Sequence, residues 1–266
     1  MSRRTPTPSA LPSRDPAAPA TVKDAGKVTA WGLVFWGAIT YASVIFARSA
    51  TAEAAVQAAL AEWGAGRMGI AWSDPRAAPP RWEAIARRAA IGAALGAGCA
   101  VLASGLAIGL RQAVVGAGEP AMGALLVGLF MAAMGAVRDE LLLRGVVLRA
   151  TRQLLPMGAA LVACGLAAAA ARLGIDGAIT PALFSEALRG TALGAIWTRD
   201  KGAWMACAAN AAWTWTMGPV LGGNLLDVRF ATEPGSASAA IAVLAVATLV
   251  ACLWAAGKLP RPRAAS

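Results

Sequence analysis

Three charged residues lie close together in an otherwise apolar part of the chain. Asp139 and Glu140 are adjacent, and Arg144 follows Glu140 by four residues. On a helix, Glu140 and Arg144 would be neighbours on one face, in the order that favours an ion pair. Asp139 would lie about 100° away around the helix, so both carboxylates could point towards one interior region.

Charged side chains inside hydrocarbon cost roughly 2.5–3.5 kcal/mol each on insertion scales. A protein keeps them there when they pair, face a polar cavity or take part in chemistry. A buried carboxylate can act as a base towards water, and a neighbouring arginine can hold it in place. Three uses stay open for Glu140 and Arg144: a structural ion pair, catalysis, or a ligand or proton site. For Asp139, solvation near a helix end and a catalytic role stay open equally.

The composition is typical of a protein that crosses a membrane several times. Of the 266 residues, 58% are hydrophobic and only 14% are charged, which is too apolar for an ordinary soluble domain. The net charge of +10 arises mostly from basic residues in the tails and between the apolar runs, where they would contact lipid headgroups. We therefore expect the lipid bilayer, and not nucleic acid, as a partner. The chain is rich in alanine, uses arginine more often than lysine and shows no signal-peptide pattern. We therefore expect a bacterial cytoplasmic membrane as its location.

Several kinds of chemistry are disfavoured by the residue types. The chain contains no histidine, the commonest general base and metal ligand. The four cysteines stand singly in apolar runs, without CxxC spacing, and are interpreted as core residues: Cys99, Cys164, Cys207 and Cys252. No P-loop, Rossmann glycine pattern or GxSxG motif occurs. We expect neither a metal site nor a cofactor.

The apolar runs predict an all-α fold, a polytopic membrane bundle of about seven (six to eight) transmembrane helices. The expected spans are residues 28–46, 89–110, 121–154, 157–171, 181–197, 203–217 and 237–256. The third would exceed the bilayer thickness, so its C-terminal part tilts or emerges. Residues 51–62 fit either an interfacial helix or a continuation of the first span. Loops are expected at 63–82 and 111–120.

These elements divide the chain into four parts. Residues 1–27 are expected to be a disordered polar tail. Residues 28–118 would hold the N-terminal transmembrane helices with an interfacial loop. Residues 119–220 would form a core around the charged stretch at residues 139–145, called the acidic motif below. Residues 221–266 would supply a last loop, a transmembrane helix and a basic tail.

The stretch DELLLRG at residues 139–145 resembles the EExxxR-Gly motif of the CPBP family, the CAAX-protease and bacteriocin-processing (Abi) intramembrane proteins. A later segment is similar to the family as well. It has a glycine-rich helix at 188–197, a charged turn at 198–202 and a helix that carries Asn210. Order and spacing agree over about residues 121–217.

The resemblance implies a membrane helical bundle with its polar site inside the bilayer, and a membrane endopeptidase that uses water activated by a carboxylate. Family members are glutamate proteases or metalloproteases whose histidines assist. Carried over by position, the catalytic set is Asp139, Glu140, Arg144 and Asn210. The amide of Asn210 would suit an oxyanion, although an interhelical hydrogen bond is the simpler interpretation. The substrate would be a membrane peptide or protein.

The sequence departs from the family pattern at several positions. Asp139 replaces a glutamate and is shorter by one methylene, which would set a carboxylate back by roughly 1.5 Å. The two motif histidines fall on Ala206 and near Ala171 or Arg172. Arg172 would either end a helix at the membrane surface or place a fixed positive charge that holds Glu140 ionised.

We therefore predict a divergent family member that lacks both motif histidines and is weakly active or inactive. An alternative is a membrane binding or regulatory partner that has lost catalysis. A small transporter or proton-relay subunit is a less favoured alternative.

Glu186 and Arg189 lie near a helix start and are expected at the membrane interface.

Overall fold

The protein is described by a computed structural model, which covers residues 21–42, 49–73 and 80–257. Within these residues the fold is almost entirely helical, which confirms the all-α class. The helices are α1 (Val22–Ala42), α2 (Ala50–Arg67), α3 (Trp82–Gly109), α4 (Met122–Asp139), α5 (Val146–Thr151), α6 (Met157–Asp176), α7 (Pro181–Asp200), α8 (Trp204–Trp215) and α9 (Ser238–Ala255). A π-helical turn, Glu140–Gly145, joins α4 to α5, a second one, Thr216–Val220, extends α8, and a 3₁₀ turn, Pro234–Ser236, precedes α9.

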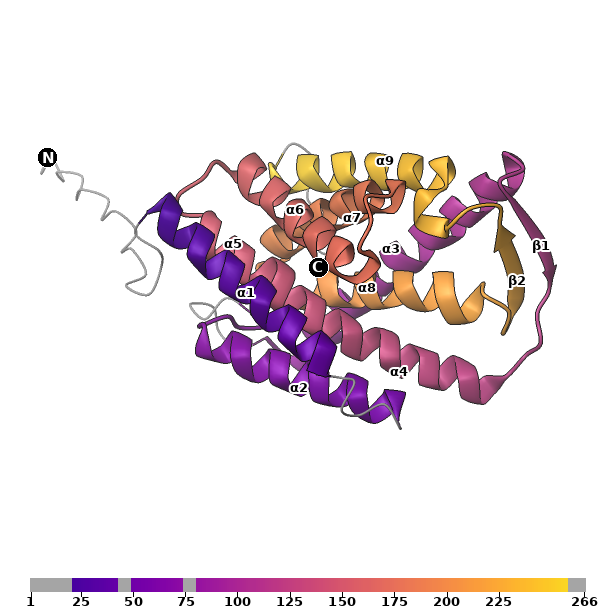
Figure 1. Ribbon diagram of the computed structural model, residues 1–266, viewed down its shortest axis with the longest axis horizontal. Coiled ribbons are helices and arrows are strands. Elements are labelled where there is room, and N and C mark those ends of the chain that lie inside the picture. Colours follow the sequence, from indigo (N-terminus) through magenta and orange to yellow (C-terminus); the bar gives the residue numbers. More distant parts are fainter. Residues whose placement is uncertain (1–20, 43–48, 74–79, 258–266) are drawn as a thin grey trace, which may run out of the picture.

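Helix α8 lies in the middle of the bundle, where it contacts α3, α4 and α7. Helices α6, α7 and α9 pack together on one side, and α1 and α2 cover α4 and α5 on the other (Figure 1). The rod formed by α4, the π-helical turn and α5 matches the single long helix that the sequence predicts at 121–154. The acidic motif therefore lies where both groups of helices meet.

Three of the described helices are long and apolar enough to cross a membrane: α3, α6 and α9. Each also has large apolar side chains on its outer surface, among them Leu102, Leu166 and Val246. An apolar outer surface is what a bilayer requires of a spanning helix. The expected number of about seven spans stays a prediction, as do the four predicted parts of the chain.

The N-terminal helix begins earlier than the sequence predicts. Residues 1–20 of the expected disordered tail lie outside the described residues, as does the basic tail from 258 onwards. Residues 22–27, however, already belong to α1. The Thr21 hydroxyl accepts a hydrogen bond from the Asp24 amide (3.2 Å) and donates one to the Asp24 carboxylate (2.7 Å). This N-terminal cap explains the earlier start.

Helix α2 is a helix of its own and not a continuation of α1. Ser49 has an extended backbone, and its hydroxyl accepts a hydrogen bond from the Ala52 amide (3.3 Å). The helix runs to Arg67, into the segment expected to be a loop. It packs along α4, and this contact explains its length better than its weak amphipathicity does.

The segments 111–120 and 221–236, expected to be loops, contain two short strands. Strand β1 (Ala113–Ala117) pairs antiparallel with β2 (Leu226–Phe230), with Val115 opposite Val228. The ribbon lies at one end of the bundle, beyond α3 and α4 (Figure 1). The sequence prediction missed it because the two strands are distant in sequence and stabilise each other only after the helices have packed.

Helices α3 and α8 approach closely because α3 has glycine at the contact. A Cβ atom at Gly96 would collide with the carbonyl oxygen of Ala209. One turn earlier, a Cβ atom at Gly92 would collide with the carbonyl oxygen of Met205. A second GxxxG pair in the same helix, Gly105 and Gly109, makes no such contact, since a Cβ atom added at either glycine would have nothing within 4 Å. The helix contact therefore uses the earlier pair of glycines.

Replacing Gly96 by alanine is expected to destabilise the protein by about 1–3 kcal/mol, because the added methyl group forces α3 away from α8. Gly105→Ala is the matched control in the same helix. It should leave the stability unchanged or raise it slightly, since alanine favours helix. Thermal unfolding of both variants in detergent measures the difference. Equal melting temperatures would contradict the packing described here.

Candidate functional site

The acidic motif adopts a π-helical turn in place of regular α-helix. All six residues of Glu140–Gly145 are buried. Gly145 is needed at its end, because a Cβ atom there would lie 2.8 Å from Ile70 and 3.1 Å from Trp197. Single π-helical turns inside α-helices are frequent at functional sites, so the local geometry marks this stretch independently of its charges.

Glu140 is the centre of a buried polar cluster. Its side chain is fully buried, and its Oε1 accepts a hydrogen bond from Asn210 Nδ2 on α8 (3.0 Å). Arg144 Nη1 lies 3.4 Å from the same oxygen, an ion pair without hydrogen-bond geometry. Arg144 and Asn210 are 1% and 2% exposed. The structure thus brings together three of the four residues that the family resemblance singled out.

Part of this cluster has unused hydrogen-bonding capacity. The second carboxylate oxygen of Glu140, Oε2, is buried and has no hydrogen-bond partner among the described residues. The same holds for Nε and Nη1 of Arg144. Leaving such a group unsatisfied costs about 1–3 kcal/mol, and more when it is charged. A small polar molecule between Glu140 and Arg144 would satisfy an acceptor and a donor at once.

Arg189 on α7 extends the cluster, which the sequence prediction missed. Its Nη1 donates to Asn210 Oδ1 (2.6 Å), and its Nη2 donates to both carboxylate oxygens of Glu186 (2.6 and 2.9 Å). The side chains of Arg189 and Glu186 are only 17% and 20% exposed, so the pair packs inside the bundle. Its expected position at the membrane interface stays a prediction. An acid and a base three residues apart in an apolar helix was the available signal.

Asp139 belongs to a second network that faces away from α8. Its Oδ1 accepts hydrogen bonds from Trp36 Nε1 on α1 (2.8 Å) and from Arg138 Nε (2.8 Å). Arg138 also donates to Gln57 Oε1 on α2 (2.7 Å) and lies over the Trp36 ring. Asp139 therefore fastens α4 to α1 and α2, while Glu140 fastens it to α8.

The positions of the two motif histidines are occupied by the core. Ala206 is fully buried in a cluster with Leu161 and Cys164. Ala171 is buried beside Trp36 and Leu142. Each of the two positions is therefore occupied by a small side chain in an apolar cluster.

Arg172 does not supply the charge beside Glu140 that the sequence allowed. Its guanidinium pairs with Asp176 (2.6 Å) and with Glu233. It also does not end a helix, because α6 continues to Asp176 and stops at Gly177, which has a left-handed backbone (φ 65°). The arginines that act electrostatically on Glu140 are Arg144 and Arg189.

The residues around Glu140 do not fit a metal ion. The nearest polar groups are an amide and two guanidinium groups, and the latter repel a cation. Among the described residues, no group of three or more histidine, cysteine, aspartate or glutamate side chains could hold a metal. The metalloprotease branch of the resemblance therefore has no support in these side chains.

A bundle of apolar helices that encloses a carboxylate, an arginine and an asparagine is a membrane protein with a buried polar site. Residues 121–216 match the family model of type II CAAX prenyl endopeptidase Rce1-like proteins. That match covers the acidic motif and Asn210, so this segment is similar to an Rce1-like domain of the CPBP family. The match and the three long apolar helices together fit a CAAX-protease-like membrane protein. Searches of curated proteins and of solved structures gave no match.

Removing one member of the Glu186–Arg189 pair is expected to destabilise the protein more than removing both. Arg189→Met leaves a largely buried carboxylate without its cation and should cost about 1–3 kcal/mol. Adding Glu186→Gln should recover part of that loss. Denaturant unfolding of both single variants and the double variant gives the coupling energy.

The control for this cycle is the ion pair between Arg229 and Asp227, in which the arginine side chain is 77% exposed. An exposed pair should show no measurable coupling. If the Glu186–Arg189 pair also shows no coupling energy, this ion pair does not stabilise the buried cluster.

Proposed function

We propose that this protein is an intramembrane endopeptidase of low activity in which Glu140 activates a water molecule. One observation carries the proposal: Glu140 Oε2 is fully buried and, like two nitrogen atoms of the neighbouring Arg144, has no hydrogen-bond partner among the residues that the structure describes. The Rce1-like domain supports peptide hydrolysis as the reaction class. A bacterial cytoplasmic membrane is the location we infer, with a membrane peptide or protein as substrate.

The chemistry would proceed by general base catalysis. The water oxygen attacks the carbonyl carbon of the scissile peptide bond while Glu140 takes the water proton. The carbonyl oxygen becomes negatively charged, and an N–H group of Arg144 donates a hydrogen bond to it. Glu140 then returns the proton to the leaving nitrogen as the C–N bond breaks. The products are a carboxylic acid, which keeps the second hydrogen of the water until it ionises, and an amine, so no further reactant is needed.

The low activity follows from the groups that surround Glu140. Without an imidazole, Glu140 must accept the proton and deliver it alone. Asn210 donates one N–H to Glu140 and accepts from Arg189, so only one N–H of its amide is left to stabilise an oxyanion. Asp139 accepts hydrogen bonds from Trp36 and Arg138, which makes it a positioning residue and not the base.

A second candidate is a membrane partner protein that has lost catalysis. The observation that favours it is the continuous chain of contacts from Glu186 through Arg189 and Asn210 to Glu140. Such a chain joins α7, α8 and the acidic motif and would be retained for stability alone. Cleavage that depends on Glu140 separates the two candidates.

The test is cleavage of a panel of membrane peptides by the purified protein in liposomes. Glu140→Gln keeps the shape of the side chain but cannot take a proton, so cleavage should fall by about 100-fold or more. Cleavage by the Asp139→Asn variant should fall much less, because asparagine can still accept the hydrogen bond from Trp36.

Glu83→Gln is the matched control, since it removes an exposed carboxylate at the start of α3. It should cleave like the wild type. If all four proteins are folded and the wild type cleaves no faster than Glu140→Gln, the peptidase proposal fails and the partner candidate gains support.

A further inference from the structure

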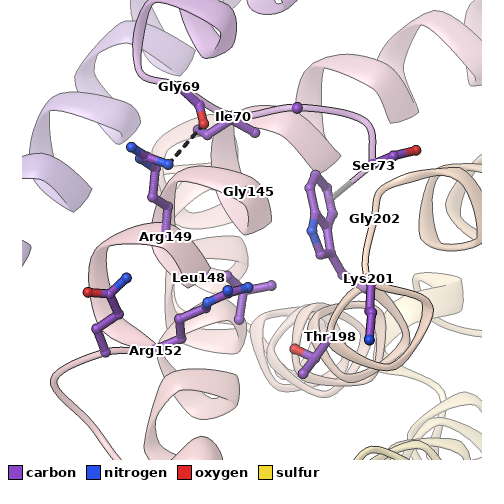
Figure 2. Close-up of a pocket in the computed structure, with 13 residues that line it drawn as sticks. Gly69, Ile70, Ser73, Gly145, Leu148, Arg149, Arg152, Thr198, Lys201 and Gly202 are labelled. Atoms are coloured by element: carbon purple, nitrogen blue, oxygen red, sulfur yellow. Dashed lines mark hydrogen bonds between the residues drawn. The ribbon is translucent and has the colours of Figure 1, made fainter. Parts of the chain in front are cut away.

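A basic pocket lies at the end of the bundle where the acidic motif continues into α5. It has a volume of about 310 Å³ and is bounded by α5, by the segment after α2 and by the turn between α7 and α8 (Figure 2). Three of its lining residues are cations, Arg149, Arg152 and Lys201, and none of the lining residues that the structure describes is acidic. The hydroxyl groups of Ser73 and Thr198 add further polar atoms.

One wall of this pocket is held rigidly by contacts across the chain. The Ala203 amide donates to the Trp72 carbonyl (3.0 Å), and Trp204 Nε1 donates to the Ser73 hydroxyl (3.2 Å). The rings of Trp72 and Trp204 lie against each other, with centroids 4.5 Å apart. A pocket whose wall is fixed in advance loses little conformational freedom when a ligand binds.

The cations are placed around the pocket before any ligand is present. Arg149 Nη1 donates to the Gly69 carbonyl (3.0 Å), which orients its guanidinium. Lys201 ends α7 with a left-handed backbone (φ 56°), a conformation that non-glycine residues adopt rarely and that is often retained at functional sites. In Figure 2 the Arg152 side chain extends from α5 towards the side of the pocket formed by Thr198 and Lys201.

Like charges that share a pocket repel one another, and an anion relieves this repulsion. The side chains of Arg152 and Lys201 make no hydrogen bond or ion pair with any described residue. Guanidinium groups bind phosphate oxygens in pairs, and an ammonium group adds a point charge. A phosphate group therefore matches both the charge and the donors of this pocket.

A second pocket adjoins the first and suits the apolar part of a lipid. It has a volume of about 340 Å³ and shares Gly69, Ile70 and Arg149 with the basic pocket. Apart from Arg67, its other described lining residues are apolar or small: Val28, Gly66, Met68, Val146 and Ala150. A phosphate beside Arg149 would thus have apolar surface next to it. That neighbourhood favours a lipid over a free phosphate ion.

We propose that Arg149, Arg152 and Lys201 form a binding site for the phosphate group of an anionic phospholipid. Basic pockets between membrane helices are suited to such headgroups, and the neighbouring tryptophan pair is of the type found at membrane interfaces. The site is separate from the Glu140 cluster and does not depend on proteolysis. It gives the protein a preference for membranes that contain anionic lipid.

The test is equilibrium binding of a short-chain fluorescent phosphatidylglycerol to the full chain in neutral detergent. Arg152→Gln combined with Lys201→Gln should weaken binding by about tenfold or more, because two charged donors are lost. Arg152→Lys with Lys201→Arg keeps both charges and should retain most of the affinity. Melting temperatures near that of the wild type establish that each variant is folded.

The matched control is Arg111→Gln with Arg229→Gln, which removes the same charge near the strands β1 and β2. Its affinity should stay close to that of the wild type. An equal loss in the control would mean that only net charge matters, and this would overturn the site. Unchanged binding in the Arg152/Lys201 double variant would overturn it too.

Two further measurements identify the source of the phosphate. Short-chain phosphatidylcholine should bind much more weakly, since its headgroup has no net charge, and equal binding would overturn the proposal. Inorganic phosphate should displace the probe only at much higher concentration. Displacement at equal concentration would support the phosphate site while identifying soluble phosphate as its ligand.

Discussion

A fully buried carboxylate needs partners, and Glu140 finds them on other helices. Asn210 donates to it from α8, Arg144 lies beside it in the motif, and Arg189 approaches from α7 through Asn210. Because an isolated charge in an apolar interior is strongly unfavourable, α7 and α8 must pack where these side chains can meet. On α3, Gly96 helps to fix the position of α8, because the missing side chain lets α3 lie directly against it.

The acidic motif also divides its contacts between the two groups of helices. Asp139 is hydrogen-bonded to Trp36, and through Arg138 it is linked to Gln57, so it holds α1 and α2. Glu140, the next residue, holds α8. Adjacent residues on a helix point about 100° apart, so the two carboxylates can face different neighbouring helices. The two adjacent carboxylates thus hold different helices. Of the two, Glu140 is completely buried and has an oxygen without a hydrogen-bond partner in the described part of the chain.

The buried polar cluster and the basic pocket lie along the same continuous helix, which runs from α4 through the π-helical turn to α5. Glu140 and Arg144 occupy its buried middle, while Arg149 and Arg152 lie further along, at the pocket near the helix end. This order follows a general rule of membrane proteins, in which charges in the interior are paired and charges near helix ends contact headgroups or water. The loss of the motif histidines leaves the paired interior intact, since Ala206 is fully buried in the apolar core.

The sequence by itself determined the helical class and the long helix with its acidic motif, and it singled out Asn210, which lies in hydrogen-bond contact with Glu140. Charges inside apolar runs are rare because they are costly, so their positions are informative without a structure. The tertiary structure alone decided that Arg189 faces Asn210, that Asp139 is bound to Trp36, and that β1 pairs with β2. These contacts join segments far apart in the chain. They depend on which helix faces lie against each other, and a single sequence with largely uniform apolar helices does not specify that.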